Sequence, residues 1–242
     1  METARIFIGY DPREAVAFHV CAQSIIEHSS MPVAIHPLAL NLLRDYDEGH
    51  TDGSNAFIYS RFLVPHLCGY SGHALFIDGD MLVRGDVADL WNLRRHDRGV
   101  QVVKHDYRTK YPTKYLGSVN EDYPRKNWSS VVLWNCAYFP NHGLRPEFVM
   151  KATGEFLHRF AWLKDEQIGD LPPEWNHLCM EYAPNPGAAL YHYTVGTPCF
   201  GGVYGQQEGS TEWFETMDRA TEPMRGCFDM AVGATGVRGG EG

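Results

Sequence analysis

Short apolar runs separated by polar turns fill the first third of the chain. The period of these runs predicts strands at residues 5–9, 33–38 and 74–77 and helices at residues 14–28 and 57–67. Asp, Gly and Pro residues lie between the runs, as expected for turns at the surface. A strand, helix, strand, helix, strand order is typical of an α/β sandwich whose central sheet is mostly parallel.

The same kind of pattern continues toward the C-terminus. Strands are predicted at residues 100–103, 130–134 and 189–192, and a helix at residues 145–159. No internal repeat or linker divides the sequence, so residues 1–229 are predicted to form one domain. Residues 230–242 are rich in glycine and are expected to form a mobile tail without function.

Two carboxylates separated by one glycine follow the third predicted strand. In an extended backbone, positions i and i+2 point the same way, so Asp78 and Asp80 are able to converge on one point. Two hard oxygen ligands suit Mg²⁺ or Mn²⁺, and Gly79 would let a bulky ligand approach the backbone. The alternative is a plain Asp-Gly turn with both carboxylates in water. Asp11 also follows a strand and is expected in the same cleft, because ligands gather at strand carboxyl ends.

The charge of the chain limits the classes of partner. A formal net charge of −9 argues against general nucleic-acid binding, which needs a basic surface. An anionic ligand would therefore need a local cation, which agrees with a bound metal. Positive charge is concentrated in one stretch that contains Lys104, Arg108, Lys110, Lys114, Arg125 and Lys126. This stretch is either a phosphate- or acceptor-facing loop or a plain solvated loop.

The cysteines and the first residues of the chain indicate in which cellular compartment the protein is expected. The six cysteines are scattered without a C-x-x-C pair, which is typical of a reducing compartment. The first residues lack the apolar region of a signal peptide, and no apolar run approaches the length of a membrane-spanning helix. We therefore expect a cytoplasmic enzyme.

Several segments from about residue 5 to 200 form an ordered set of motifs. They are Tyr10-Asp11, Tyr59-x-Arg61 followed by Pro65, the segment from Phe76 to Val83, the segment from Ser129 to Asn135, Glu166-Gln167 with Leu171-Pro172 and Trp175-Asn176, and His192 with Gly196 and Pro198. In this order they resemble the family 8 glycosyltransferases, in particular a bacterial or viral type. The resemblance implies a GT-A fold, which is a Rossmann-like nucleotide-binding sandwich. It also implies retaining transfer of a hexose from a nucleotide sugar, with UDP as the expected nucleotide.

The resemblance further implies a metal site. Asp78, Asp80 and His192 would bind Mn²⁺, because an imidazole ligand favours Mn²⁺, although Mg²⁺ is also compatible. The metal would neutralise the charge that develops on the departing diphosphate. Without the resemblance, a histidine between Tyr191 and Tyr193 is more often a packed core residue.

The resemblance also assigns donor-binding and catalytic residues. The donor-binding residues are Tyr10, Asp11, Arg61, Asp78, Gly79, Ser130 and Gly196, and those nearest the reacting sugar carbon are Gln167, Glu166 and Asp165. From the residues alone, Arg61 would form a surface ion pair worth under about 1 kcal/mol. Tyr10-Asp11 would be a strand-end turn, and residues 164–167 a solvated helical turn. Because glutamine is a poor nucleophile, front-face attack is favoured over double displacement on Glu166 or Asp165.

Four positions depart from the family pattern. Trp128 replaces an asparagine, Ser130 a glycine, Glu166 an aspartate, and Thr197 a lysine that contacts the donor phosphates. Diphosphate binding must therefore use another cation, and Lys104, Arg125 and Lys126 are the candidates. Acceptor contacts are expected at residues 107–123, with glycan, lipid and protein acceptors all open.

Two other functions are compatible with parts of the pattern. A haloacid-dehalogenase-type phosphatase also has an apolar strand that ends in D-x-D, with Lys164, Asp170 and Glu174 as later motifs. However, that motif normally follows the first strand, and Asp78 comes much later. A nucleotide-sugar-binding module without catalysis is the second alternative, suggested by the departures at Trp128, Ser130 and Thr197.

Overall fold

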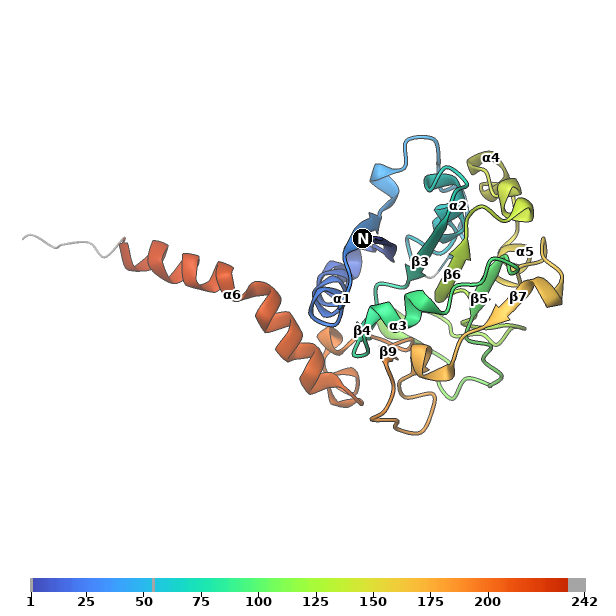
Figure 1. Ribbon diagram of the computed structural model, residues 1–242. Helices are drawn as coiled ribbons and strands as arrows, with labels where there is room; N and C mark the ends of the chain where they lie inside the picture. Colours follow the sequence, from blue (N-terminus) through green and yellow to red (C-terminus); the bar gives the residue numbers. More distant parts are fainter. Residues whose placement is uncertain (1, 54, 235–242) are drawn as a thin grey trace, which may run out of the picture.

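Strands and helices alternate through the first 80 residues, as the hydrophobic pattern predicts (Figure 1). The computed structural model describes residues 2–53 and 55–234, with side chains described up to residue 222. The strands are β1 (Ala4–Gly9), β2 (Val33–Leu38), β3 (His73–Ile77), β4 (Met81–Val83), β5 (Val100–Val102), β6 (Val131–Asn135), β7 (Ile168–Asp170), β8 (His177–Leu178) and β9 (Leu190–His192). The α-helices are α1 (Ala15–Glu27), α2 (Val64–Leu67), α3 (Val87–Asn92), α4 (Pro146–Val149), α5 (Gly154–His158) and α6 (Ser210–Ala234).

A six-stranded sheet with the order β2-β1-β3-β6-β5-β7 forms the centre of the molecule. The pairs β1–β2, β1–β3 and β5–β7 are parallel, whereas β6 runs antiparallel to both of its neighbours, β3 and β5. The sheet is therefore mostly parallel, and the predicted α/β class is confirmed.

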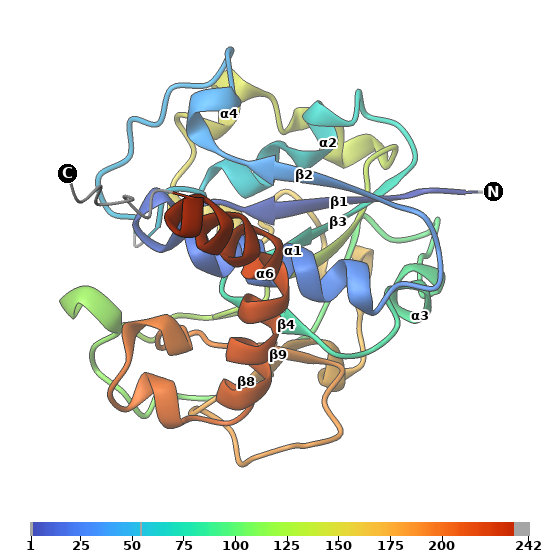
Figure 2. The same ribbon diagram turned by 90° about the vertical axis from the view of Figure 1, so that its left-hand side faces the viewer.

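Alternating side chains cover both faces of this sheet. Phe7 and Phe76 face a cluster that includes residues of α2, α4 and α5, whereas Ile6 and Ile8 face a second cluster with residues of α1 and α3. Figure 2 shows α1 and α2 on opposite sides of β1. Because successive residues of a strand point to opposite faces, one apolar run serves both layers of the sandwich.

A second, three-stranded sheet with the order β4-β9-β8 lies beside the first. Tyr191 of β9 and Tyr193 just after this strand pack with Val20 of α1 and Trp213 of α6, so this cluster joins the small sheet to both helices. Beyond this packing, α6 extends away from the body (Figure 1). The helix continues to Ala234, so the domain boundary predicted after residue 229 falls inside it, and residues 235–242 lie outside the described part.

One local prediction was wrong in detail, and one apolar side chain in a predicted helix is exposed. The helix expected at residues 145–159 is two short helices, α4 and α5, because the Thr153 side chain accepts a hydrogen bond from Phe156 N (3.2 Å) and starts a new helix. Within α1, Ile26 belongs to the apolar period of the sequence but is 59 % exposed, whereas Ile25 is fully buried. A single exposed isoleucine is normal on a protein surface.

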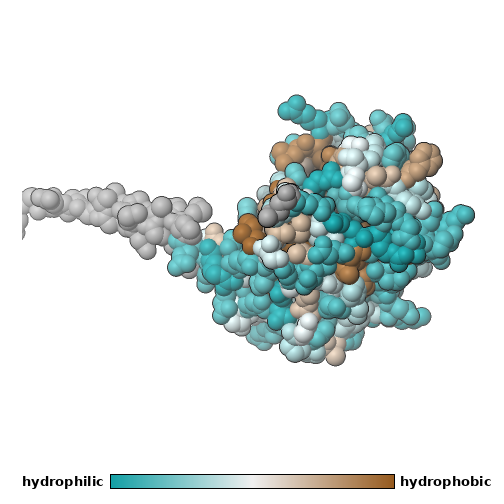
Figure 3. Space-filling model, viewed as in Figure 1, coloured by the Kyte–Doolittle hydropathy of each residue, from teal (hydrophilic) through white to brown (hydrophobic). Residues whose placement is uncertain are grey.

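The surface and the cysteines add two observations. None of the helices in the described residues combines the length and the apolar character needed to cross a membrane. On the face shown in Figure 3, apolar residues form small separate patches on a mostly hydrophilic surface. Within the described side chains, Cys21, Cys68, Cys136, Cys179 and Cys199 are free thiols. The cytoplasmic location stays a prediction.

Candidate active site

Asp78 and Asp80 lie where the chain passes from the central sheet to the small sheet. Asp78 follows β3, where its N–H donates to the Ser130 carbonyl oxygen (2.9 Å), and Asp80 directly precedes β4. The antiparallel register of β4 and β9 pairs Met81 with His192, so His192 lies beside Asp80. The side-chain ligand atoms of Asp78, Asp80 and His192 lie within 4.8 Å of one another. The three groups therefore meet in space, as predicted.

A chain of hydrogen bonds behind His192 sets which ring nitrogen carries the proton. Asn176 donates through Nδ2 to the Ser130 hydroxyl (2.8 Å) and to the Asn127 carbonyl oxygen (3.4 Å), which can only accept. Asn176 Oδ1 therefore faces His192 Nδ1 at 3.0 Å and accepts a hydrogen bond from it. In the neutral ring this leaves the lone pair on Nε2, the atom that faces Asp80. His192 is thus held in the tautomer that a metal ligand requires.

Asp80 has one carboxylate oxygen that other protein groups leave free. Its Oδ1 is buried, has no hydrogen-bond partner within the described part of the chain, and lies 3.5 Å from His192 Nε2. A buried carboxylate oxygen without a partner is costly unless a cation pairs with it. Two carboxylates and an imidazole therefore form a ligand set that fits a divalent ion such as Mn²⁺.

Arg61 is buried, which excludes the surface ion pair considered from the sequence. Its Nη1 lies 2.7 Å from Asp78 Oδ1 and donates to the Ser129 carbonyl oxygen (3.0 Å), while Nε donates to the Ile58 carbonyl oxygen (3.1 Å). Burial raises the pKa of Asp78 to about 6, although the Arg61 charge opposes this rise. Arg61 thus orients Asp78 and balances its charge inside the protein.

Lys114 is a second cation, after Arg61, that the structure brings to the two carboxylates. It lines the same cavity, and its Nζ donates to the Thr194 hydroxyl (3.4 Å). Its neighbour Tyr115 is anchored because the backbone N–H donates to the Val195 carbonyl oxygen (2.9 Å), just beyond β9. Burial lowers the pKa of Lys114, and the two carboxylates oppose that effect. The sequence shows Lys114 only as one member of a basic stretch, so it was missed as a site residue.

The three cations suggested by the sequence have other partners. Lys104 and Arg125 pair with acidic side chains in and before β7, at 3.0 and 2.6 Å, and Lys126 donates to the Asn120 side chain (2.7 Å). In the described part of the chain, none of them lines the cavity of the two carboxylates. Thr197, at the position of the family's lysine, is fully buried and contacts Cys199. Among the lysines considered, the geometry therefore favours Lys114.

The two glycines predicted to bind the donor are in tight contact with protein atoms. A Cβ on Gly79 would lie 2.3 Å from the Gly9 carbonyl oxygen, so the space expected for a bulky ligand is filled by the backbone at the end of β1. A Cβ on Gly196 would lie 3.0 Å from atoms of both Tyr115 and Tyr204. Both glycines therefore permit close packing around the site.

Asp11 and Tyr10 make the contacts of a strand-end turn. The Asp11 carboxylate accepts from Arg13 N (2.9 Å), Arg13 Nη2 (2.6 Å) and Ala56 N (3.0 Å). Burial raises the pKa of Asp11, but these hydrogen bonds outweigh burial and lower it. Tyr10 packs edge-on against Phe18 of α1, with ring centroids 5.6 Å apart. The donor-binding role of both residues stays a prediction.

The residues predicted to act on the sugar lie away from the carboxylates. Backbone hydrogen bonds place Gln167 beside Asn135, the last residue of β6. Gly99 N donates to the Gln167 carbonyl oxygen (2.9 Å), and Asn135 N donates to the Gly99 carbonyl oxygen (3.1 Å). Asp78 is level with Ser130 at the opposite end of β6. The Gln167 side chain bonds Tyr138 and Lys164, and the Asp165 side chain is 84 % exposed. Within the described residues, the carboxylate cavity is lined by neither Gln167 nor the adjacent Asp165 and Glu166.

Three adjoining cavities run along this edge of the sheet. The central one, about 50 Å³ around Asp78 and Asp80, shares Asn55 and Ile58 with a cavity of about 290 Å³ that contains Asp11. On the other side it shares Lys114, Ser118 and Tyr123 with a cavity of about 520 Å³. Asp11 and the two carboxylates are therefore neighbours in one cleft, and the carboxylates line its narrowest part.

His158 is a second group of the cavity that the sequence did not reveal. Its Nδ1 lies 2.7 Å from the Ser129 hydroxyl, and its buried Nε2 has no partner among the described residues. Burial, together with the nearby Arg61, lowers the pKa of His158 to about 3, so its ring is neutral. It offers a neutral hydrogen-bonding group at the edge of the cavity.

The fold and the site together define a glycosyltransferase of the GT-A type. The galactosyltransferase LgtC, solved in complex with donor and acceptor sugar analogs, superposes with a TM-score of 0.61 at 16 % identity, covering 89 % of this chain and 95 % of that chain. WbbM, a bifunctional glycosyltransferase, superposes with a TM-score of 0.57 at 16 % identity, but this chain spans only 49 % of it. These likenesses establish the fold.

Sequence comparison establishes the family. The profile of Glycosyl transferase family 8 matches residues 13–138, and the chain belongs to this family. Protein CDI of Arabidopsis thaliana is 45 % identical in an alignment 206 residues long, which covers 81 % of this chain and 79 % of that protein. This relative is a plant protein, and the bacterial or viral type suggested by the motifs stays a prediction. Membership of a glycosyltransferase family also overturns the phosphatase alternative.

Proposed function

We propose that this protein is a metal-dependent, retaining glycosyltransferase that moves a hexose from a UDP-sugar to an acceptor. The observation that carries the proposal is the meeting of Asp78, Asp80 and His192, with His192 Nε2 held free by Asn176. Lys114 lines the same cavity and supplies a cation for phosphate oxygens.

A divalent ion fits this arrangement. Asp78, Asp80 and His192 would hold Mn²⁺, and the free Asp80 Oδ1 and the His192 lone pair are the atoms best placed to bind it. When bound, the ion would act as a Lewis acid toward the charge on the departing diphosphate. Mg²⁺ fits the carboxylates as well, but the imidazole favours Mn²⁺.

The order of the cavities supports an orientation for the donor. The cavity beside Asp11 has room for the nucleoside, the narrow part between the carboxylates and Lys114 is suited to the diphosphate, and the sugar would point toward Tyr123. Lys114 would thus take the role of the phosphate-contacting lysine of the family, whose position is occupied here by Thr197. Ser130 would contribute indirectly, by holding Asn176 behind His192.

The chemistry of the cavity favours front-face attack. Of the described residues that line it, only Asp78 and Asp80 carry a carboxylate, and both are committed to the proposed metal. In this course the acceptor oxygen bonds to the anomeric carbon while the bond from that carbon to the diphosphate oxygen breaks. The acceptor proton passes to an oxygen of the leaving phosphate. The configuration of the sugar is retained because the acceptor arrives on the face from which the diphosphate departs.

The acceptor would enter from the segment that contains Tyr123. A cavity of about 520 Å³ lies there, lined by His105, Asp106, Tyr107, Arg108, Asp122, Tyr123, Pro124, Arg125 and Lys126. Tyr123 lines both this cavity and the one around the carboxylates. The exposed hydroxyls of a sugar suit such a mixed polar and aromatic surface. This agrees with the acceptor contacts predicted for residues 107–123.

Donor binding and turnover test the proposal together. We expect UDP-hexoses to raise the thermal midpoint only in the presence of Mn²⁺, and to release UDP slowly even without acceptor. Asp80→Asn should abolish both effects, whereas Asp45→Asn, on the exposed surface, should leave them unchanged. Absence of a metal-dependent shift with every UDP-hexose would contradict the proposal. A shift without UDP release, in the presence of varied acceptors, would favour the binding module without catalysis.

A further inference from the structure

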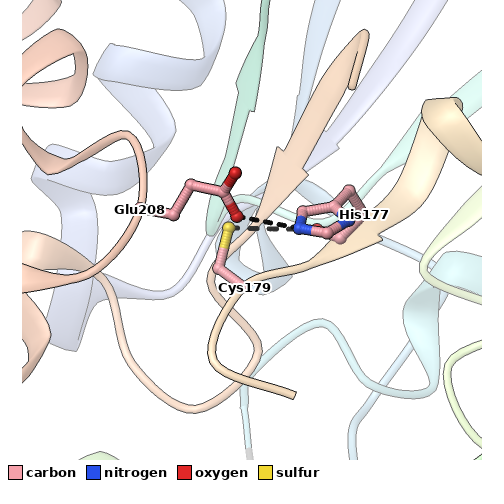
Figure 4. Close-up of side chains that lie close together, drawn as sticks. All are labelled: His177, Cys179 and Glu208. Atoms are coloured by element: carbon pink, nitrogen blue, oxygen red, sulfur yellow. Dashed lines mark hydrogen bonds and ion pairs between the residues drawn. The ribbon is translucent and has the colours of Figure 1, made fainter. Parts of the chain in front are cut away.

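A second group of metal-binding side chains lies outside the donor cavity. His177 of β8, Cys179 just after it, and Glu208 before α6 bring their ligand atoms within 4.8 Å of one another (Figure 4). His177 and Cys179 are buried, and the Glu208 side chain is only 14 % exposed. The group joins two segments that are about thirty residues apart in the sequence, and none of its members coincides with a proposed ligand of the donor metal.

The contacts of the group show which atoms face inward. Glu208 Oε1 accepts from Asn185 N (2.6 Å) and the Tyr191 hydroxyl (3.2 Å), whereas Oε2 lies 2.9 Å from His177 Nε2. Figure 4 shows the carboxylate, the imidazole and the sulfur turned toward one another. The Cys179 thiol has only a long contact of 3.9 Å to the His177 carbonyl oxygen. A His–Glu ion pair alone accounts for two of the three residues and gives no reason for the thiol beside it.

The chemistry of the three ligands selects the ion. A thiolate, an imidazole and a carboxylate form a mixed set that suits Zn²⁺, while Mg²⁺ and Ca²⁺ take oxygen ligands and avoid sulfur. The hydrogen bonds that Asn185 and Tyr191 donate to Glu208 are of the kind that orient a ligating carboxylate. We propose that His177, Cys179 and Glu208 bind one Zn²⁺ ion, with a water molecule as the fourth ligand. On binding, the Cys179 thiol loses its proton to solvent and the His177 proton moves from Nε2 to Nδ1 through solvent, so that the His177–Glu208 hydrogen bond is replaced by one bond from each residue to zinc.

The position of this zinc site indicates a structural role. β8 pairs with β9, where Leu178 lies opposite His192, and Cys179 N donates to the His192 carbonyl oxygen (2.9 Å). The ion would therefore join the segment before α6 to the strand that lies behind His192. It would hold the small sheet in place without contacting the donor.

Cobalt substitution distinguishes this site from the donor site. Co²⁺ absorbs in the near ultraviolet through charge transfer only when a thiolate is a ligand, and Asp78, Asp80 and His192 offer none. We expect the full chain, purified without chelator, to retain one Zn²⁺ per chain by elemental analysis. After chelation, Co²⁺ should produce the thiolate band in the wild type and in Asp80→Asn, but not in Cys179→Ser. Cys199→Ser, at a cysteine outside the group, should keep the band.

Stability supplies a second measurement in case Cys179→Ser folds poorly. Zn²⁺ added to the stripped protein should raise the thermal midpoint, and Glu208→Gln, which keeps the hydrogen-bonding shape of the side chain, should weaken Zn²⁺ binding at least about tenfold. A wild-type spectrum without the thiolate band would overturn the proposal, as would a band that persists in Cys179→Ser. An equal Zn²⁺ affinity in the wild type and Glu208→Gln would show adventitious binding only. None of these results depends on glycosyl transfer.

Discussion

At the scale of single residues, the site depends on a few hydrogen bonds that decide which atoms remain free. The side-chain NH₂ group of Asn176 donates hydrogen bonds to the Ser130 hydroxyl and the Asn127 carbonyl oxygen, so its side-chain oxygen faces His192. Arg61 neutralises Asp78, while Asp80 keeps a free oxygen. Hydrogen bonds and an ion pair between protein groups thus define the proposed metal site.

Asn176→Ala tests this arrangement of His192. Loss of the amide oxygen frees the imidazole to rotate and to change tautomer, so Mn²⁺ affinity should fall about 10–100-fold. Isothermal titration with Mn²⁺ measures the change, and Asn92→Ala on the exposed end of α3 serves as the control. An unchanged Mn²⁺ affinity in Asn176→Ala would mean that Asn176 does not hold His192 as a ligand.

Lys114→Met tests whether Lys114 is the cationic side chain that binds the diphosphate. Removing a charged hydrogen-bond donor should weaken UDP binding in the presence of Mn²⁺ by about 1.5–3 kcal/mol, or roughly 10–150-fold. Lys104→Met is the matched control, because Lys104 pairs with Asp170 outside the cavity. If Lys104→Met weakened UDP binding more than Lys114→Met, the geometric assignment would be wrong.

Because of Glu14, we expect the free energy of unfolding to depend on pH. Burial and the like charge of Asp80 raise its pKa to about 8, from 4.5 for the free group, and the Tyr115 hydroxyl donates to it. Between these two values the unfolded chain ionises Glu14 while the folded chain keeps it protonated, so stability falls as pH rises. Glu14→Gln removes this penalty and should raise the thermal midpoint more at pH 8 than at pH 5. Equal gains at both pH values, or a similar gain in the exposed Glu147→Gln, would contradict the assignment.

At the scale of elements, the site lies at a passage between two sheets. β3 ends at Asp78 in the large sheet, β4 begins after Asp80 in the small one, and β9 supplies His192 from the opposite direction. The loop that contains Lys114 is tied to the residues just beyond β9. Three segments that are distant in the sequence, at residues 78–80, 114 and 192, therefore meet at this passage.

Gly79→Ala tests the tightness of this passage. The added Cβ would meet the Gly9 carbonyl oxygen at 2.3 Å, which forces β1 and the turn apart, so we expect a loss of about 1–3 kcal/mol in the free energy of unfolding. Urea denaturation measures the loss. Gly49→Ala, where a Cβ would meet nothing within 4 Å, should change stability little. Equal stability of both variants would show that the backbone shifts easily at this turn.

At the scale of the whole molecule, the central sheet has two ends and the candidate site occupies one of them. The proposed metal ligands, Lys114 and the cavities lie at the Asp78 end, whereas Gln167 is level with Asn135 at the other end. The resemblance to family motifs assigned Gln167 by sequence position, and the sheet register places it by geometry. The two assignments lead to different results on mutation.

Gln167→Ala distinguishes a catalytic role of Gln167 from a structural one. If Gln167 only ties Tyr138 to the Lys164 turn, the variant should lose stability while kcat/KM for transfer stays within about tenfold of the wild type. A catalytic role would instead lower kcat by about 10²–10⁴-fold without loss of stability. Thermal unfolding and steady-state kinetics on the same preparation measure both quantities.

The sequence by itself determined the α/β class, the position of the carboxylate pair and the family, because strand period, D-x-D spacing and motif order are local and follow the chain. It placed His192 correctly beside the carboxylates only through the resemblance. The roles of Asn176, Lys114 and His158, and the grouping of His177, Cys179 and Glu208, depended on the tertiary structure. These groups come from separate strands and loops, and their neighbours are set by sheet register and backbone hydrogen bonds, which no local pattern records.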